Sequence, residues 1–464
     1  MLNSVKPILE YEFNGEASPS MAGSFAYLPF TIPDGVCTIE VEYEFAGKSP
    51  EEAVVDIGLL EPGSRELVEG MKFLRGWSGS NKKKFTVSRV YATPSYTAGD
   101  IRSGEWSVIL GFYKVPRAGL SYTVKVKVYR ECAEGQGRQL SLGAPAAKRG
   151  WVKGDLHLHS VHSDGDSTLE EIASVARVLG LDFVSVTDHN TVSHIAEMGW
   201  RSGFLNGIFF LRGVEMTSYK GHMNVYGVSE TPEFRVGSAS ELAKVVKYLR
   251  GQGALLSVNH PKPLGPDWEL GDMSFADAVE VFHSVWEFNN YISLKRWDEL
   301  LAKGHRLGLV GGSDAHEIKG KKSLLAPGTP TTWVYVEELS EDGLLQGIRS
   351  QRVFVSESPQ GPKLILKASD GKHELWTGDV ASSGELDVVI QVEGAKAQLL
   401  RIVAGGEVVY REAITSDFLV KKVRVNAKSP YVRAEILREV ADADDPYHME
   451  NILSALSNPI YVNI

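Results

Sequence analysis

The strongest constraint on the fold is a change near residue 151 in the pattern of apolar and polar residues. From there to about residue 357, short apolar runs alternate with segments of helical pattern. The apolar runs are residues 154–159, 183–188, 208–214, 254–259, 278–282, 306–311 and 332–336. The helical patterns are residues 168–179, 240–250, 292–302 and 341–349, the first with an N-cap signature at Ser167 and Thr168. Such alternation predicts a parallel β/α architecture, closed or nearly closed into a barrel, with one hairpin at residues 221–228.

The sequence on either side of this region has a strand-like pattern. Residues 121–129 (SYTVKVKVY) alternate apolar and polar side chains, which is typical of a half-buried strand. Similar runs occur throughout residues 8–145 and 360–464. A chain of 464 residues is too long for one compact core. We therefore predict β-sandwich domains over residues 1–145 and 358–464, a barrel over residues 151–357, and a linker at residues 135–150.

Composition and charge exclude several classes of function. The net charge of −10 disfavours a general nucleic-acid binder, and Lys82 to Lys84, the one dense basic run, is expected to form a solvated turn. The sequence shows no signal-peptide pattern and no apolar stretch long enough to cross a membrane. Two cysteines, Cys37 and Cys132, fit a reducing compartment. These features predict a cytoplasmic protein whose metal ligands, if it has any, are histidine and carboxylate.

Ten of the twelve histidines lie between residues 157 and 316. Most follow a predicted strand at its C-terminal end, where parallel β/α folds gather their active-site loops. His157 and His159 alternate with Leu158, so they share one face of the first strand. Several imidazoles buried together would carry a large desolvation cost unless a cation compensated them. The pattern therefore predicts a cluster of metal ions, whereas His162, His194 and His305 lack a motif and are expected to have surface or core roles.

The motifs HxH, SDG, TDH, a single Glu, NHP and GSDAH, in this order, resemble the polymerase-and-histidinol-phosphatase (PHP) domain. The resemblance covers residues 152 to 357. A flanking β domain on each side, together with the C-terminal motif SNPIY at 457–461, is similar to the CehA/McbA-like branch of that family. The resemblance implies a distorted (β/α)7 barrel that holds two or three divalent ions. Imidazole and carboxylate ligands suit zinc, manganese and iron alike.

The resemblance also implies a role for each motif residue. His157, His159, Glu215 and Asp314 are expected to hold the first ion. Glu215 is expected to bridge to a second ion that His222 and His260 complete. A third ion is expected at Asp164, His189 and His316. Apart from the resemblance, Asp155 and Asp188 are candidates to orient ligand imidazoles, with a purely structural role as the alternative. Lys262 and His283 are candidates for contacts to substrate or ligands, although Lys262 fits a solvent-facing lysine better.

The expected chemistry is attack on a small phosphorylated metabolite by a hydroxide that bridges two metal ions. A carboxylic ester or carbamate is the alternative, because the same nucleophile attacks a carbonyl. A phosphatase pocket is expected to present Lys or Arg beside the ions, and an esterase pocket an apolar wall to which Phe282 or Trp286 contributes. A third alternative is a non-catalytic binding protein. The sequence indicates neither the native substrate nor the oligomeric state.

Overall fold

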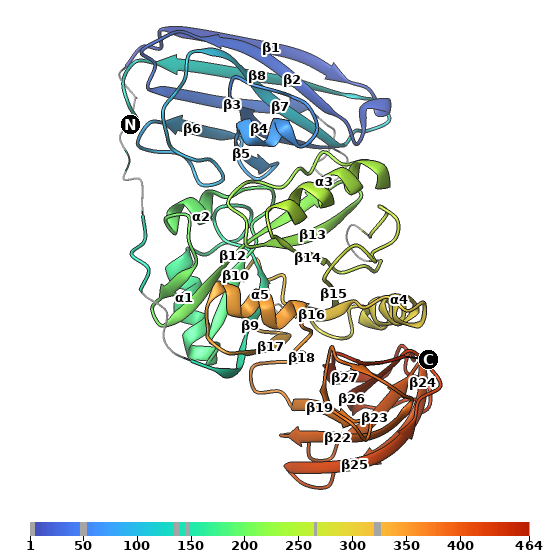
Figure 1. Cartoon of the computed structure of the whole chain (residues 1–464). Helices are drawn as coiled ribbons and strands as arrows, with labels where there is room; N and C mark the ends of the chain where they lie inside the picture. The colour runs from blue at the N-terminus through green and yellow to red at the C-terminus, as the bar shows by residue number, and fades with distance from the viewer. Residues whose placement is uncertain are drawn as a thin grey trace.

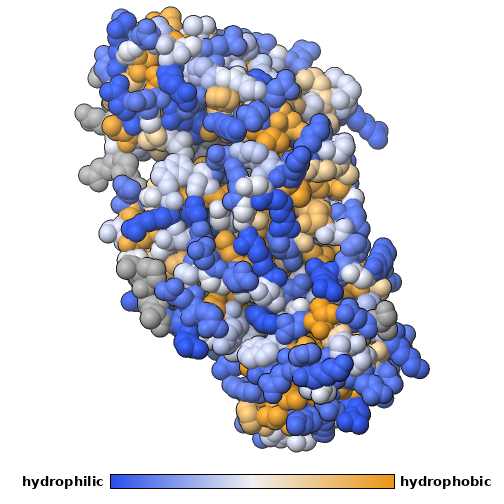
Figure 2. Space-filling view, viewed as in Figure 1, coloured by the Kyte–Doolittle hydropathy of each residue, from blue (hydrophilic) through white to orange (hydrophobic). Residues whose placement is uncertain are grey.

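The structure is a computed structural model that describes residues 5–46, 53–133, 135, 139–143, 148–263, 267–319 and 326–463. Figure 1 shows three stacked parts, with the N-terminal part at the top in blue and the C-terminal part at the bottom in orange and red. The surface seen from the same side is mainly hydrophilic, with hydrophobic residues in scattered patches (Figure 2). None of the described helices is long and apolar enough to cross a membrane. Of the expected linker, residues 136–138 and 144–147 lie outside the described residues.

The N-terminal part consists of two antiparallel four-stranded sheets packed face to face. One sheet has the order β1 (Leu9–Ala17), β8 (Leu120–Tyr129), β3 (Thr38–Ala46), β6 (Lys84–Ser88). The other has the order β2 (Phe25–Ile32), β7 (Gly104–Lys114), β4 (Val54–Leu60), β5 (Leu74–Gly79). Short 3-10 helices occupy Pro19–Met21 and Glu69–Phe73. The alternation of β8 buries Val124, Val126 and Val128 between the sheets, which is the packing expected of a sandwich.

Cys37 and Cys132 form a disulfide that joins two segments 95 residues apart. The expectation of a reducing compartment rested on two cysteines read as unpaired, and the structure pairs them. Disulfides persist in oxidising environments, so the paired cysteines remove the support that this expectation had. The cytoplasmic location stays a prediction.

The central part contains every strand predicted for it. β9 (Gly150–Leu158), β10 (Phe183–Val186), β12 (Ile208–Ser218), β14 (Leu255–Val258), β15 (Ala278–His283) and β16 (Gly308–Gly312) run in one direction. The predicted hairpin strand is β13 (Gly221–Tyr226), inserted antiparallel between β12 and β14. β11 (Gly203–Leu205) pairs with β12. The backbone after β16 reaches back to β9, where His159 N donates to Ala315 O (3.1 Å) and Asp314 N donates to His157 O (2.9 Å).

One expectation for this region is wrong. The seventh predicted strand, β17 (Thr331–Val336), pairs antiparallel with β9, so it does not extend the parallel set. It leads into β18 (Val353–Ser356), also antiparallel, and through it into the C-terminal part. A strand parallel to β9 needs a crossover connection that brings the chain back to the end of the sheet where β9 begins. β17 instead starts from the opposite end, so it runs antiparallel to β9.

The helices agree with their predicted positions. α1 (Leu169–Leu179), α3 (Ala239–Gly251), α4 (Asn290–Ala302) and α5 (Glu341–Arg349) match the four patterns, and a short α2 spans Ser193–Glu197. The predicted N-cap of α1 is a full capping box, in which Thr168 and Glu171 satisfy each other's backbone N–H groups. Apolar side chains of these helices, such as Ile172 and Leu344, are fully buried.

The C-terminal part is also built from two sheets. The first has the order β20 (Glu374–Trp376), β19 (Lys363–Ser369), β22 (Glu385–Glu393), β25 (Phe418–Asn426). The second contains β27 (Ile452–Ser457), β26 (Tyr431–Glu439), β23 (Leu399–Ala404) and β24 (Glu407–Ala413), with β21 (Val380–Ala381) and β28 (Ile460–Val462) paired at its side. This second sheet continues from the central sheet through the pairing of β18 with β27. The domain boundary predicted at residues 357 and 358 therefore lies within a continuous sheet.

A buried ion network ties the C-terminal part to α4. Arg433 pairs with Asp298 of α4 (2.6 Å) and with Glu435, and Arg401 pairs with the other oxygen of Glu435 (2.5 Å). All four side chains are at most 2% exposed. Since every charge has a hydrogen-bonded partner, the network fixes the orientation of the two parts without leaving an isolated charge in the core.

Candidate metal centre

The nine predicted ligands gather at one end of the central strands. His157 lies in β9, Glu215 in β12 and His222 in β13, while the loops that follow β9, β10, β14 and β16 carry the other six ligands. The backbone of two of them is strained, because His260 (φ 28°) and Asp314 (φ 54°) adopt positive φ. Such conformations cost about 1–3 kcal/mol in a non-glycine residue and persist where function requires them.

Glu215 lies at the centre of the cluster and is 1% exposed. Its Oε1 is 3.4 Å from His157 Nε2, 3.1 Å from His222 Nδ1 and 3.6 Å from His260 Nε2. Its Oε2 is 2.7 Å from His189 Nδ1 and 3.6 Å from His159 Nε2. One carboxylate thus faces five imidazoles, which is the arrangement expected of a group that bridges two cations.

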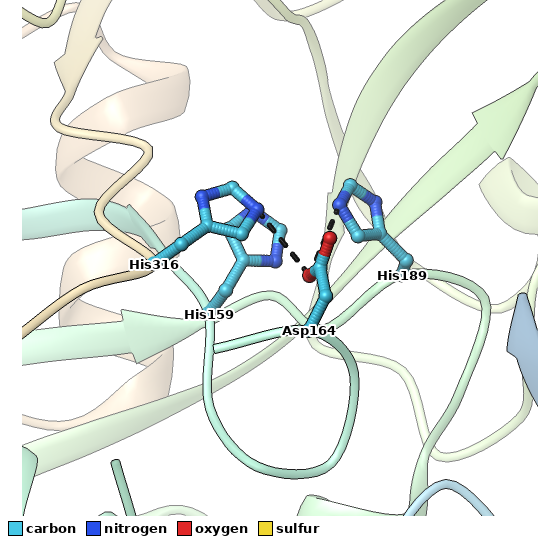
Figure 3. Close-up of side chains that lie close together, drawn as sticks. All are labelled: His159, Asp164, His189 and His316. Carbon is cyan, nitrogen blue, oxygen red and sulfur yellow. Dashed lines mark ion pairs between the residues drawn. The ribbon is translucent and has the colours of Figure 1, made fainter. Parts of the chain in front are cut away.

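The remaining two carboxylates complete the arrangement. Asp314 Oδ1 is 2.8 Å from His159 Nε2 and 3.3 Å from His157 Nε2. Asp164 Oδ1 is 3.3 Å from His316 Nε2 and 3.6 Å from His189 Nε2. Figure 3 shows His316, His159 and His189 arranged around Asp164, with the loop that carries Asp164 curving beneath them.

Among the residues that the structure describes, ligand atoms within 4.8 Å of one another form four groups that could hold a metal ion. The groups are His159, Asp164, His189 and His316; His157, His159 and Glu215; Glu215, His222 and His260; and His260, Glu280 and His283. The third group is the set predicted for the second ion, and the second group contains the ligands predicted for the first ion except Asp314. The first group adds His159 to the set predicted for the third ion. The fourth was not predicted.

In the described part of the chain, several buried atoms of the cluster and its neighbour His283 have no hydrogen-bond partner. They are His157 Nε2, His159 Nε2, Glu215 Oε2, Asp314 Oδ1 and His283 Nδ1. A buried polar atom without a partner costs about 1–3 kcal/mol, and here such atoms converge on one point. Because imidazole nitrogens and carboxylate oxygens are the donor set of zinc, manganese and iron, the residues fit divalent ions.

Burial and neighbouring charges shift the pKa values of the groups in the cluster. Burial opposes ionisation of Glu215 and Asp314, but the surrounding imidazoles outweigh it and hold both pKa values well below the usual range. Burial also opposes protonation of His157, yet Glu280, Asp314 and Glu215 raise its pKa well above normal. The pKa of His159 falls to about 4 through burial and the neighbouring His316 and His189. The carboxylates are therefore ionised, the form that binds cations.

Hydrogen bonds set the imidazole orientations. Glu280 Oε1 is 2.9 Å from His157 Nδ1, and its Oε2 accepts from the His260 backbone N–H at 3.0 Å. His316 Nδ1 lies 2.8 Å from Asp314 O, and His189 Nδ1 lies 2.6 Å from Thr217 Oγ1. In His157 and His316 a proton on Nδ1 leaves Nε2 free to face the cluster. Such orienting partners tune ligand imidazoles in metal sites.

Glu280 is the residue that the sequence reasoning missed. It is 2% exposed, and as a single acid within the apolar run AVEVF of β15 it carried a signal. His283, expected to be a further contact, does face the site, with Nε2 3.1 Å from Asp314 Oδ2. Lys262 is buried, and its Nζ donates to Asn290 Oδ1 at 2.6 Å. Burial lowers the pKa of Lys262 to about 7.

Asp155 and Asp188, the other two acids considered as orienting groups, bind backbone N–H groups and serine hydroxyls respectively. Asp155 accepts from the N–H groups of His157 (3.1 Å), Ser313 (3.1 Å) and Gly328 (2.7 Å), so it fixes strand ends and contacts no ligand imidazole. Asp188 accepts from the hydroxyls of Ser160 and Ser163, both at 2.6 Å. Its Oδ2 also lies 3.2 Å from His194 Nδ1, which gives that histidine a core role, as expected.

A cavity of about 390 Å³ opens beside the cluster, and Asp164, His189 and His222 form part of its wall. Its other wall comes from the N-terminal sandwich, including Trp77 and Tyr113. The expectation that Phe282 or Trp286 forms an apolar wall is wrong, because these two side chains line a separate cavity with Arg438 and Glu357. The run at Lys82 is also not simply solvated, since Lys82 Nζ donates to the carbonyls of Val161 (3.2 Å) and Ser163 (3.1 Å).

Comparisons with known proteins give distant structural likenesses only. No protein-family model and no curated protein sequence matches the chain. A two-domain protein from Bacteroides vulgatus that contains a predicted PHP-like metal-dependent phosphoesterase is 16% identical, with a TM-score of 0.38 over 71% of this chain and 100% of that one. PsfC from Pseudomonas syringae is 18% identical, with a TM-score of 0.33 over 44% of this chain and 90% of that one. An amidohydrolase from Chromobacterium violaceum is 17% identical, with a TM-score of 0.25 over 35% of this chain and 87% of that one.

These TM-scores are all below 0.5, so the likenesses carry no argument about the activity of this chain. The PHP resemblance and its CehA/McbA-like branch stay predictions that rest on the motifs. What the structure shows by itself is a buried cluster of histidines and carboxylates with the composition of a divalent metal centre.

Proposed function

We propose that the protein is a metal-dependent hydrolase whose nine clustered side chains hold two or three divalent ions. His157, His159, Glu215 and Asp314 would hold the first ion, and Glu215, His222 and His260 the second. Asp164, His189 and His316 would hold the third. The convergence of unpartnered buried ligand atoms on one point is the observation that carries this proposal.

The chain's own residues prepare the site for such chemistry. Ions bound there would activate water and polarise a substrate oxygen. Glu280 holds His157 in the orientation that turns Nε2 to the cluster, and the Asp314 carbonyl does the same for His316. Asp155 fixes the backbone of β9 against the loop after β16, so the side chains that these segments carry are held in register. The cavity beside Asp164, His189 and His222 gives a substrate access to the cluster.

The substrate that we propose is a phosphoester, because a cluster of divalent ions suits the spread of negative charge in phosphoryl transfer. Lys262 adds a buried amine on which Glu280 and Asp314 act and which, with its pKa lowered to about 7, carries a positive charge below that pH. One observation favours the second candidate, a carboxylic ester or carbamate. Among the described residues that line the cavity there is no lysine or arginine, whereas Trp77, Tyr113 and Tyr219 are present. This composition suits an organic group better than a second phosphate.

Metal analysis of the protein as purified, followed by a substrate screen, tests this proposal. The screen contains phosphomonoesters, phosphodiesters, carboxylic esters and aryl carbamates. We expect bound divalent metal, hydrolysis of at least one class, and loss of both activity and metal in His157→Ala and Asp314→Ala. The matched control is His373→Ala, an exposed histidine of the C-terminal part. Activity that survives both cluster substitutions would show that the centre is wrongly assigned, and absence of metal and turnover would favour a binding protein.

A further inference from the structure

The cavity beside the cluster is shared equally between two parts of the chain. Eight of its lining residues belong to the central part and eight to the N-terminal sandwich. Figure 1 shows this sandwich lying directly over β13, α2 and α3 of the central part. A substrate that reaches the cluster through this cavity must therefore contact the N-terminal sandwich.

Aromatic rings form one side of the cavity. The Tyr219 ring, between β12 and β13, is 5.1 Å from Tyr113 of β7 and is stacked on Phe25 of β2 at 5.3 Å. Trp77 of β5 lies behind, 6.1 Å from Phe25 and 3% exposed. Because the rings pack against one another across the interface, they form a preorganised apolar face for a flat group.

A buried carboxyl group completes this wall. Asp56 of β4 is 9% exposed, and its Oδ2 accepts a hydrogen bond from Tyr219 Oη at 2.6 Å. In the described part of the chain its Oδ1 accepts no hydrogen bond, while the cavity is lined by this residue. Burial raises the pKa of Asp56 to about 6, so the group is ionised at pH 8.

The sandwich is fixed to the loop that carries a predicted ligand. Asn81 Nδ2 donates to Ser163 O at 2.5 Å, and Lys82 Nζ donates to the same carbonyl. Ser163 immediately precedes Asp164. On the other side, Thr191 Oγ1 donates to Ser95 O at 2.9 Å. These contacts hold the wall and the cluster at a constant separation, which a specificity pocket requires.

We propose that the N-terminal sandwich forms the specificity pocket of the active site, in which Asp56, Tyr113 and Trp77 bind a flat, positively charged organic group of the substrate. The inference rests on the proposed function for the reaction, but the pocket itself is defined by the sandwich. A carboxylate beside aromatic faces is the combination that binds organic cations. A carboxylate also repels a second anionic group. No lysine or arginine lines the described cavity wall, and the charges of Lys83 and His189, which act on Asp56, do not outweigh the effect of burial on its pKa.

Binding of benzamidine and of its neutral analogue benzamide to the metal-loaded full-length protein tests this inference without turnover. We expect isothermal titration calorimetry at pH 8 to show at least about tenfold tighter binding of benzamidine, because an ionised carboxylate lies in the pocket. Asp56→Asn keeps an acceptor for Tyr219 and should reduce this preference to about twofold or less. Asp34→Asn, in an exposed turn, is the matched control and should leave the preference unchanged.

Substitutions of the aromatic wall provide a second measurement. Tyr113→Ala should weaken benzamidine binding about tenfold, whereas Tyr113→Phe should retain it because the ring remains. Equal binding of the two ligands by the wild type, or an Asp56→Asn variant with an unchanged preference, would overturn the inference. If no ester is hydrolysed but Asp56 governs binding, the proposed function fails and the pocket stands. If esters are hydrolysed and Asp56 has no effect on binding, the proposed function stands and the inference about the pocket fails.

Discussion

Replacing Glu280 by glutamine is the sharpest test of how the cluster is organised. Glu280 uses both carboxylate oxygens, one facing His157 Nδ1 at 2.9 Å and the other accepting from the His260 backbone N–H at 3.0 Å. Glutamine has the same shape but only one acceptor oxygen. In Glu280→Gln, one of these two donors must therefore face an amide NH2 group.

The size of the effect follows from this geometry. Leaving one buried donor without an acceptor costs about 1–3 kcal/mol of folding free energy. If His157 loses its partner, its orientation and basicity change, and substitutions of such groups lower metal affinity by about 10–100-fold. That range corresponds to about 1.4–2.8 kcal/mol of binding free energy. Because His157 is completely buried, water cannot replace the lost carboxylate, so we expect the upper half of the range.

Competition with a chromogenic chelator measures the affinity, and urea unfolding of the metal-free protein measures the stability separately. Glu299→Gln, an exposed position on α4, is the matched control and should change neither quantity. The reasoning would be refuted by a Glu280→Gln variant that folds normally and binds metal within about twofold of the wild type. In that case Glu280 does not orient His157.

Three further perturbations test other features of the structure. Asp155→Asn should lower the free energy of unfolding by about 1–3 kcal/mol, because one acceptor oxygen replaces two that serve three backbone N–H groups; urea unfolding checks this. Arg433→Met should cost about 3–5 kcal/mol in the same assay by leaving Asp298 uncompensated, whereas the exposed Arg438→Met should cost less than about 1 kcal/mol. Asp56→Asn should become more stable relative to the wild type as pH rises from 4 to 7, by up to about 3 kcal/mol, and a pH-independent difference would contradict this.

The sign of the Asp56 effect follows from its raised pKa. Burial raises the pKa from 3.8 to about 6, while Tyr219, His189 and Lys83 oppose the shift. Below pH 3.8 the carboxyl is neutral in both the folded and the unfolded state, and no penalty exists. As pH rises to about 6 the unfolded state loses its proton first, so the wild type loses stability and retains the full penalty above pH 6. A group that destabilises the fold at neutral pH is the type expected at a functional position.

Local sequence patterns predicted most helices and strands of the central part, because these patterns depend only on residues that are close in the sequence. The capping box at Thr168 and the alternation of β8 are set by neighbours in sequence, and the structure confirms both. The direction of β17 could not be predicted in this way. Its antiparallel pairing with β9 depends on where the chain returns after the loop that follows β16, and its residues are equally suited to either direction.

The candidate site shows the same division. Most of its nine residues could be predicted because they lie in short motifs near strand ends, whereas Glu280 lies alone within a strand. Asp56 and Tyr113 were beyond reach for a different reason. They precede the first histidine motif by more than forty residues, and only the packing of the sandwich on the β12–β13 hairpin brings them to the cavity.

The pairing of β18 with β27 has a consequence for how the chain can be divided. A fragment that stopped near residue 357 would leave β18 as an open edge, paired with β17 on one side but with the N–H and C=O groups that face β27 unpaired. It would also leave Asp298 of α4 without Arg433. An exposed apolar edge strand is a template for aggregation. The central part is therefore expected to be insoluble on its own, because residues 358–464 supply the strand that covers its last edge.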